Sequence, residues 1–188
     1  MKTINALIII LLAGTLSAWA QKSEIDLSKS HVLWTGKKIG GTHNGKILIQ
    51  SGSFELKNGE IVSGNVVIDM NSITNDDLKD AGYNRQLVDH LKSDDFFGVN
   101  NYPTATFKLT SAGKFNSDKA VVTGLLTIKG KTEKVSFVVN RRGNVYLSQL
   151  KVDRSKFGVR YGSKSFFNDL GDKAIDDTFT LDIKLVLK

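Results

Sequence analysis

The chain has 188 residues, a formal net charge of +7 at pH 7 and no cysteine. Its length fits a single domain with its own hydrophobic core. The lack of cysteine excludes disulfides, thiolate metal sites and the lipid-modified cysteine of a lipoprotein. Lysines such as Lys108 and Lys184 alternate with apolar residues, which is more typical of a solvated face than of a binding patch.

The first twenty residues have the pattern of a secretory signal peptide. Lys2 precedes an apolar run, Ile4–Leu16, that is too short to span a bilayer, and the small-residue site Ala18-Trp19-Ala20 follows. We expect cleavage near Ala20, so that residues 1–20 are removed and residues 21–188 form the exported, periplasmic or secreted domain. An uncleaved anchor is the alternative. Export argues against a nucleic-acid partner.

Beyond this segment, apolar and polar residues alternate in short runs. Ala105, Phe107 and Leu109, for example, are separated by Thr106 and Lys108. Such a period of two indicates half-buried strands with one wet face, which favours antiparallel pairing. Glycine-containing turn signals separate the runs, at Asn44-Gly45, Asn58-Gly59, Gly130-Lys131 and Gly143-Asn144. We therefore predict strands near 31–38, 45–57, 60–70, 104–113, 119–129, 132–140, 144–153 and 175–187.

Eight antiparallel strands predict an all-β chain closed into a barrel, which leaves no exposed sheet edge; a two-sheet sandwich is the alternative. The apolar phase changes across Ser51-Gly52, which indicates a β-bulge. Residues 84–93 break the period, because Leu87, Val88 and Leu91 share one helical face. We expect one short helix there, after the third predicted strand.

A second region without strand periodicity covers residues 155–173. It contains four aromatic side chains: Phe157, Tyr161, Phe166 and Phe167. Loops of this length without secondary structure are usually functional. We expect this loop to fold over one end or edge of the barrel.

The chain carries no recognisable catalytic motif. His31, His43 and His90 form no metal-binding motif, and His43 is expected at the Asn44-Gly45 turn. There is no G-x-S-x-G nucleophile elbow. Adjacent acids such as Asp94-Asp95 point in different directions and make a poor acid–base pair. We expect no catalytic residue, no metal and no cofactor, although a chance arrangement in space stays open.

The interior of the predicted barrel admits two interpretations. A barrel of eight strands is either filled by its own side chains or holds one ligand. Small inward candidates such as Gly64 and Ala105 lie among large ones such as Phe107 and Phe137. Alternation alone does not distinguish a filled barrel from a hollow one.

Ordered motifs over residues 26–187 resemble those of the YceI-like, polyisoprenoid-binding, lipocalin-like family of bacterial secreted proteins. A helix end, a double phenylalanine and the only proline make the most informative motif, HLKSDDFF…YPTATF, at residues 90–107. The other matching residues are Asp26, Ser30, His31 and Trp34; His43, Gly45, Gly52 and Phe54; Asp69, Met70, Ser72, Ile73, Thr74 and Asp76; Gly124, Leu126–Gly130 and Thr132; and Asp153–Ser155 and Phe157–Val159.

The resemblance implies a barrel that encloses a long apolar ligand, typically a polyprenol or an isoprenoid quinone. The apolar residues expected to line the ligand are Val66, Ile68, Met70, Leu91, Phe96, Phe97, Phe107, Leu109, Leu126, Ile128, Phe137 and Phe157. Charge alone suggests Arg154, Arg160 and Lys164 as partners of a polar head group. Residues 161–172 depart from the family pattern as a Phe-rich insertion, expected to act as a lid or to reshape the pocket.

The sequence thus predicts a binding protein that stores or transports an isoprenoid-type lipid. A membrane protein that uses quinones is the further partner that this role suggests, and the choice between monomer and dimer stays open. Two alternatives remain: an enzyme that acts on a hydrophobic substrate, and a filled barrel that serves as a structural or partner-binding domain.

Overall fold

The structure, a computed structural model, describes residues 20–188, so the predicted signal peptide lies outside the described residues apart from the exposed Ala20. The regular structure of these residues consists of one α-helix, α1 (Ala81–Lys92), nine strands and three short 3-10 helices, η1 (Met70–Ser72), η2 (Arg154–Phe157) and η3 (Gly171–Lys173). The strands are β1 (Gln21–Glu24), β2 (His31–Lys38), β3 (Gly41–Lys57), β4 (Glu60–Asp69), β5 (Thr104–Ala112), β6 (Lys119–Ile128), β7 (Lys131–Arg142), β8 (Val145–Asp153) and β9 (Thr178–Val186).

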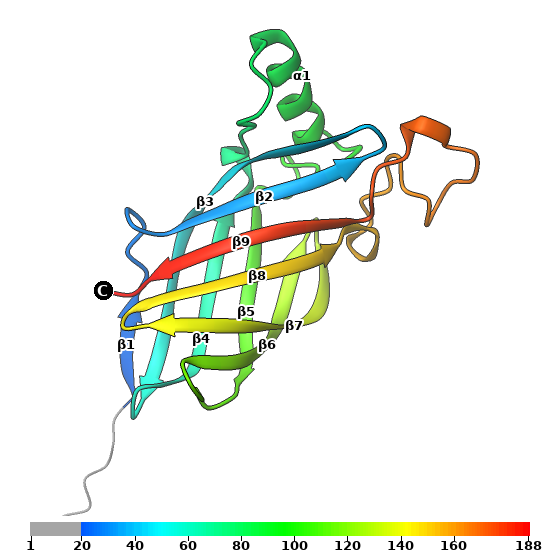
Figure 1. Cartoon of the computed structure of the whole chain (residues 1–188). Coiled ribbons are helices and arrows are strands. Elements are labelled where there is room, and N and C mark those ends of the chain that lie inside the picture. The colour runs from blue at the N-terminus through cyan, green and yellow to red at the C-terminus, as the bar shows by residue number, and fades with distance from the viewer. Residues whose placement is uncertain (1–19) are drawn as a thin grey trace, which may run out of the picture.

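Strands β2 to β9 form a closed antiparallel barrel of eight strands (Figure 1). The order runs β3-β2-β9-β8-β7-β6-β5-β4, and β4 pairs with β3 to close the ring. The short β1 pairs with the second half of β3, beside the half that β2 uses. The predicted eight-stranded barrel with one helix is confirmed, and the sandwich alternative is wrong because the sheet closes on itself.

One predicted turn is wrong. Asn44-Gly45 lies within β3, and the reversal occurs earlier, at Ile39-Gly40, where Gly40 has φ of 82°. A Cβ at Gly45 would overlap the backbone carbonyl of Thr74, to which the indole Nε1 of Trp34 donates at 3.0 Å. Gly45 is therefore needed for the close approach of the loop after β4, and not for a turn.

The predicted bulge in β3 lies close to its expected position. Strand pairing shifts between Ile49, opposite Ile68, and Ser51, opposite Val67, so that Gln50 is the additional residue. Ile49 before the bulge and Phe54 after it are both buried. The bulge thus keeps the apolar residues of both halves of β3 on the inner face.

Helix α1 lies at one end of the barrel, which is uppermost in Figure 1 and is called the upper end here. The helix begins three residues before its predicted start because the Asp80 side chain accepts a hydrogen bond from Tyr83 N and caps it. None of its residues is fully buried. The loop between β8 and β9 and the β2–β3 turn lie at the same end (Figure 1). No helix in residues 20–188 has the length and hydropathy needed to cross a bilayer.

Candidate functional site: an apolar cavity in the barrel

The barrel encloses a cavity of about 550 Å³. Its lining extends from Tyr146, on β8, to the exposed Lys38 and Asp172 at the upper end. The cavity therefore reaches solvent at the upper end, beside α1. Its volume lies within the range of about 300–1,000 Å³ that is usual for sites that bind small molecules. The interior is not filled by the protein's own side chains.

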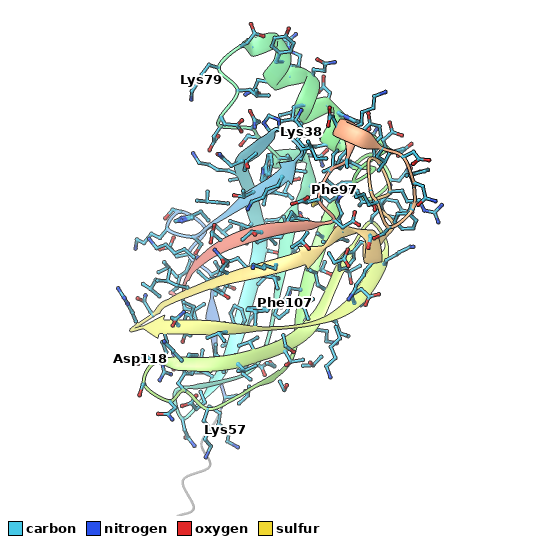
Figure 2. All side chains as sticks on the ribbon, turned by 45° about the vertical axis from the view of Figure 1, so that its right-hand side comes forward. Lys38, Lys57, Lys79, Phe97, Phe107 and Asp118 are labelled. Carbon is cyan, nitrogen blue, oxygen red and sulfur yellow. The ribbon has the colours of Figure 1, made fainter. Side chains whose placement is uncertain are left out.

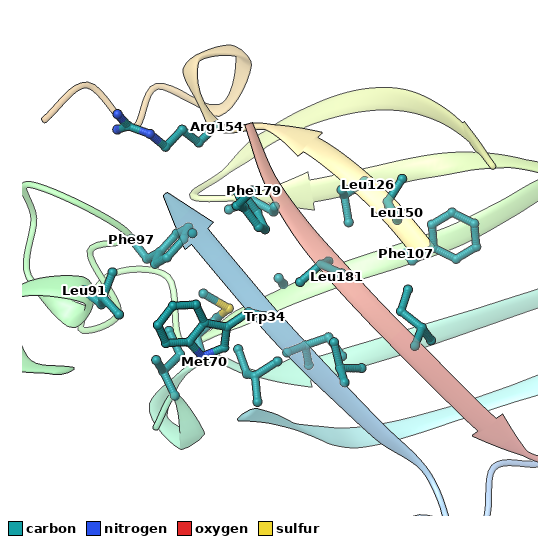
Figure 3. Close-up of a pocket in the computed structure, with 18 of the residues that line it drawn as sticks. Trp34, Met70, Leu91, Phe97, Phe107, Leu126, Leu150, Arg154, Phe179 and Leu181 are labelled. Atoms are coloured by element: carbon teal, nitrogen blue, oxygen red, sulfur yellow. The ribbon is translucent and has the colours of Figure 1, made fainter. Parts of the chain in front are cut away.

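Apolar side chains from all eight barrel strands cover the cavity wall, and Figure 3 shows part of it. The alternation of the sequence produces this wall, because successive side chains on a strand point to opposite faces. The inner face of β9 contributes Phe179, Leu181, Ile183 and Leu185, for example. The further apolar lining includes Val32, Ile47, Phe54, Ile61, Val122, Val139 and Leu150.

A glycine on β6 makes room for an aromatic ring of the wall. A Cβ at Gly124 would overlap the ring of Phe107 and would lie 2.7 Å from the carbonyl oxygen of Lys108. The Phe107 ring therefore packs directly against the backbone of β6. Its other neighbour is Phe137, with ring centroids 5.5 Å apart. The pair covers the wall while leaving the lumen open.

Phe96 and Phe97 lie at the upper end, where both line the cavity. The Phe97 ring meets Phe179 with centroids 6.3 Å apart, and Phe96 packs near Tyr161 at 5.7 Å. Lys129 Nζ donates to the carbonyl oxygens of Asp94 and Phe96, both at 2.7 Å, and so fixes this segment to the end of β6. Burial lowers the pKa of Lys129, against the opposing effect of nearby carboxylates.

Arg154 is 3% exposed, and its side chain binds the backbone of the loop that follows it. Its guanidinium donates to the backbone carbonyls of Val159, Tyr161, Ile175 and Asp176 at 2.8–3.2 Å. Nη2 also lies 3.4 Å from Oδ1 of Asp177. Burial raises the pKa of Asp177, but hydrogen bonds from serines and the charge of Arg154 outweigh it and lower that pKa overall.

The lysines, arginine, aspartates and histidines of the lining all come from the upper end of the barrel: Lys37, Lys38, His43, His90, Arg154, Asp172, Lys173 and Asp176. The hypothesis of an enzyme predicted ionisable groups that converge within the lumen; below the upper end, the lining contains one ionisable side chain, Tyr146. In residues 20–188 no three His, Asp or Glu side chains are placed to hold a metal ion. The arrangement can therefore hold an apolar chain inside with a polar end near the opening.

The structure places the predicted ligand-binding residues in two groups. The cavity lining contains Val66, Ile68, Met70, Leu91, Phe96, Phe97, Phe107, Leu109, Leu126, Ile128 and Phe137. Phe157 lies outside it, since the turn after β8 buries this ring in the core, at 2% exposure.

The three head-group candidates do not converge on the cavity, since only Arg154 lines it. Arg154 reaches the lining, but its donors are already bonded to backbone carbonyls. Arg160 and Lys164 are exposed and outside the lining, and the Arg160 guanidinium lies 4.7 Å from the ring centre of Phe166.

Sequence reasoning missed the contribution of His43, which is in β3 and not at a turn. Its Nδ1 lies 2.8 Å from Oδ2 of Asp77, and its side chain reaches the cavity. It also missed Trp34, whose indole lines the cavity beside Met70 (Figure 3). Continuing the alternation of β2 inward from Val32 would have indicated Trp34.

Comparison with known proteins identifies relatives of the chain. The family model described as a YceI-like domain matches residues 24–187. UPF0312 proteins of Pseudomonas aeruginosa strains are 39% identical over 85 residues, which is 45% of this chain and 40% of theirs. The aligned segment thus spans less than half the length of these curated relatives.

Two solved structures are similar over nearly their whole length. Burkholderia cenocepacia BcnA has a TM-score of 0.68 and 28% identity, covering 86% of this chain and 98% of that protein. A polyisoprenoid binding domain from Saccharophagus degradans, implicated in plant cell wall breakdown, has a TM-score of 0.60 over 88% and 97%. At 16% identity, the second supports the fold alone. With the family model matching almost all of residues 20–188, the chain belongs to the YceI-like domain family.

Proposed function

We propose that the protein binds a long apolar lipid of the isoprenoid type, a polyprenol or an isoprenoid quinone, and stores or transports it. The observation that carries this proposal is the apolar cavity of about 550 Å³, which opens at one end of a closed barrel. A chain of methyl and methylene groups matches the deep lining, which offers no charged partner. The polar end of the lipid would lie at the upper end, where the charged side chains are.

The hydrophobic effect is sufficient to drive this binding. Each buried methylene group contributes about 0.8 kcal/mol. The loss of freedom in a flexible chain and in the complex offsets part of this gain. A cavity that already exists in the folded protein lowers that cost, because the wall needs no rearrangement.

The relatives and the N-terminal sequence support the rest of the role. One structural neighbour is described as a polyisoprenoid binding domain. The signal-peptide pattern of residues 1–20 supports a periplasmic or secreted location. For an exported carrier of a quinone, a membrane protein that uses quinones is the partner that would receive or supply the cargo.

Two neighbouring leucines on β6 provide a matched test. Leu126 lines the cavity, whereas Leu125 is 38% exposed on the outer face. We expect L126W to place an indole in the lumen and to reduce bound lipid roughly tenfold, while L125W keeps it. Native mass spectrometry and lipid extraction of the purified proteins measure the cargo, and thermal unfolding monitored by circular dichroism checks that both variants fold.

The proposal would be contradicted if wild-type protein purified from its native host contains no lipid and takes up neither an added polyprenol nor an added quinone. Equal lipid content in folded L126W and L125W would show that the lipid binds elsewhere.

A further inference from the structure

The upper end of the barrel carries a continuous rim made of two segments, residues 37–41 of the β2–β3 turn and residues 158–175 of the loop before β9. Backbone hydrogen bonds join them: Ile39 N donates to Ala174 O at 3.2 Å, and Asp176 N donates to Lys37 O at 2.9 Å. Lys38 and Ile175 form a β-bridge between these bonds. Figures 1 and 2 both show the two segments side by side at the upper end. Lys38 and Asp172, one from each segment, line the cavity.

The loop of the rim is held in shape from below. Arg154 fixes its two ends through the carbonyls described above. Ser163, at 0% exposure, accepts hydrogen bonds at its carbonyl from the amides of Phe166 and Phe167. Ser165 Oγ donates to Oδ2 of Asp177 at 2.6 Å. The part of the loop around Phe166 and Phe167 is therefore held in a hydrogen-bonded frame.

This frame presents apolar side chains to solvent. Phe166 and Phe167 are 39% and 49% exposed, and neither lines the cavity. Ile39 and Tyr161 on the same rim are each 46% exposed. Four large apolar side chains exposed on two joined segments, two of them adjacent phenylalanines, mark an interaction surface more than a chance exposure.

The charge of the rim is mainly positive. The rim carries five basic residues, Lys37, Lys38, Arg160, Lys164 and Lys173, against three acidic ones, Asp169, Asp172 and the exposed Asp176 directly after the loop. Arg160 lies over the ring of Phe166, so that a cation and an aromatic ring share one site. Aromatic residues surrounded by lysine and arginine suit the boundary of an anionic bilayer, where the rings enter the head-group region and the cations meet lipid phosphates.

We propose that this rim docks the protein on an anionic lipid bilayer, with Phe166 and Phe167 inserted among the head groups. The docking brings the cavity opening to the membrane surface. The docking itself does not depend on which ligand the cavity holds. The transfer of a lipid between the bilayer and the cavity, which docking would allow, rests on the function proposed above.

Co-sedimentation with vesicles tests the docking on the full-length protein. Vesicles of phosphatidylcholine with about one third phosphatidylglycerol are compared with pure phosphatidylcholine. We expect wild-type protein to prefer the anionic vesicles and to lose most of this preference in about 0.5 M salt. F166S/F167S should bind them roughly tenfold more weakly, and K164E several-fold more weakly.

The matched control is V121S/V138S, which removes a pair of exposed apolar residues from the barrel wall. Val121 and Val138 face each other on β6 and β7 and are 55% and 48% exposed. We expect this variant to bind vesicles as the wild type does. Because residues 1–19 are common to all variants, differences between them report on the rim.

Equal vesicle binding by F166S/F167S and wild type, or binding by wild type that ignores phosphatidylglycerol, would overturn the proposal. Lipid content, measured on the same preparations by extraction, separates this failure from failure of the cavity function. The rim variants should keep their cargo, since the substituted phenylalanines are outside the lining.

Discussion

Arg154 shows how a single residue shapes the upper end of the barrel. A buried guanidinium is tolerated here because its donors meet four backbone carbonyls and a nearby carboxylate. The planar arrangement of five N–H groups suits this task, and a lysine could not reach the same set. A residue that charge alone suggested for a head group thus has a structural role in positioning the rim.

Replacing Arg154 by methionine should therefore destabilise the loop more than the barrel. The R154M variant leaves four carbonyls and the Asp177 carboxylate without their partner, which we expect to cost about 3 kcal/mol. Trypsin should cut faster after Lys164, because the loop frame opens locally. Urea unfolding and timed proteolysis measure the two effects.

The control is R142M, since Arg142 is exposed at the end of β7. It should leave both measurements unchanged. If trypsin cuts R154M at the same rate as the wild type, the role assigned to Arg154 is contradicted.

At the scale of elements, the segment between β4 and α1 is held to β3 through Asp77. Its carboxylate accepts from Asn44 N at 2.8 Å and from the side-chain amide of Asn75, and it lies 2.8 Å from Nδ1 of His43. Burial raises the pKa of Asp77, but these hydrogen bonds together lower it below its usual value. The charged form is thus favoured in the folded state.

This shift gives the stability a defined pH dependence. A carboxyl whose pKa is lowered by folding stabilises the protein fully above its unfolded pKa, near 3.8, and this contribution is lost as the pH falls through the lower, folded pKa. We expect D77N to cost about 1–2 kcal/mol at neutral pH and progressively less below about pH 4. Urea unfolding at a series of pH values measures it.

D76N serves as the comparison, because the exposed carboxylate of Asp76 forms an ion pair with Lys46, at 3.4 Å, while the backbone bonds of Asp76 stay in the variant. Its effect should be small at every pH, as for most surface ion pairs. If D76N and D77N lower the free energy of unfolding by the same amount, the contacts of Asp77 with β3 do not contribute to stability.

The elements also show what the sequence could predict. Alternation locates β2 and β4 to β9 within a few residues, because a closed barrel buries one face of each strand. The polar β1, Gln-Lys-Ser-Glu, has no such pattern; it pairs with the edge of the second half of β3 that β2 does not reach, opposite the edge that β4 uses. The Asn44-Gly45 signal was misleading, since a glycine that permits close approach is indistinguishable in sequence from one that permits a turn.

The residues of the candidate site also fall into those that the sequence predicts and those that it does not. Inward residues of strands, such as Phe107 and Leu126, follow from period two once a barrel is assumed. The upper end does not, because the loop of residues 158–175 has no periodicity and its shape depends on the bonds of Arg154 to distant carbonyls. Whether the lumen is hollow depends on side-chain packing in three dimensions, which alternation does not encode.

For the whole molecule, a hollow core means that the native state lacks contacts that a filled barrel would have. Apolar atoms facing an empty lumen lose dispersion contacts on one side. A bound hydrocarbon restores them and binds only the folded barrel. Ligand occupancy and global stability are therefore coupled through the closed sheet.

Removing the cargo should accordingly lower the unfolding temperature of the whole barrel. A ligand at about one hundred times its dissociation constant stabilises the folded state by about 2.7 kcal/mol. In a protein of this size, that corresponds to a shift of roughly 5–11 °C. Calorimetry of the protein before and after extraction with a hydrophobic resin measures the shift, and adding back a polyprenol or quinone should restore it. The L126W variant should show a smaller change on extraction, because its indole already occupies part of the lumen. An extracted wild type that melts unchanged, and does not respond to added lipid, would mean that the cavity and the stability of the barrel are uncoupled.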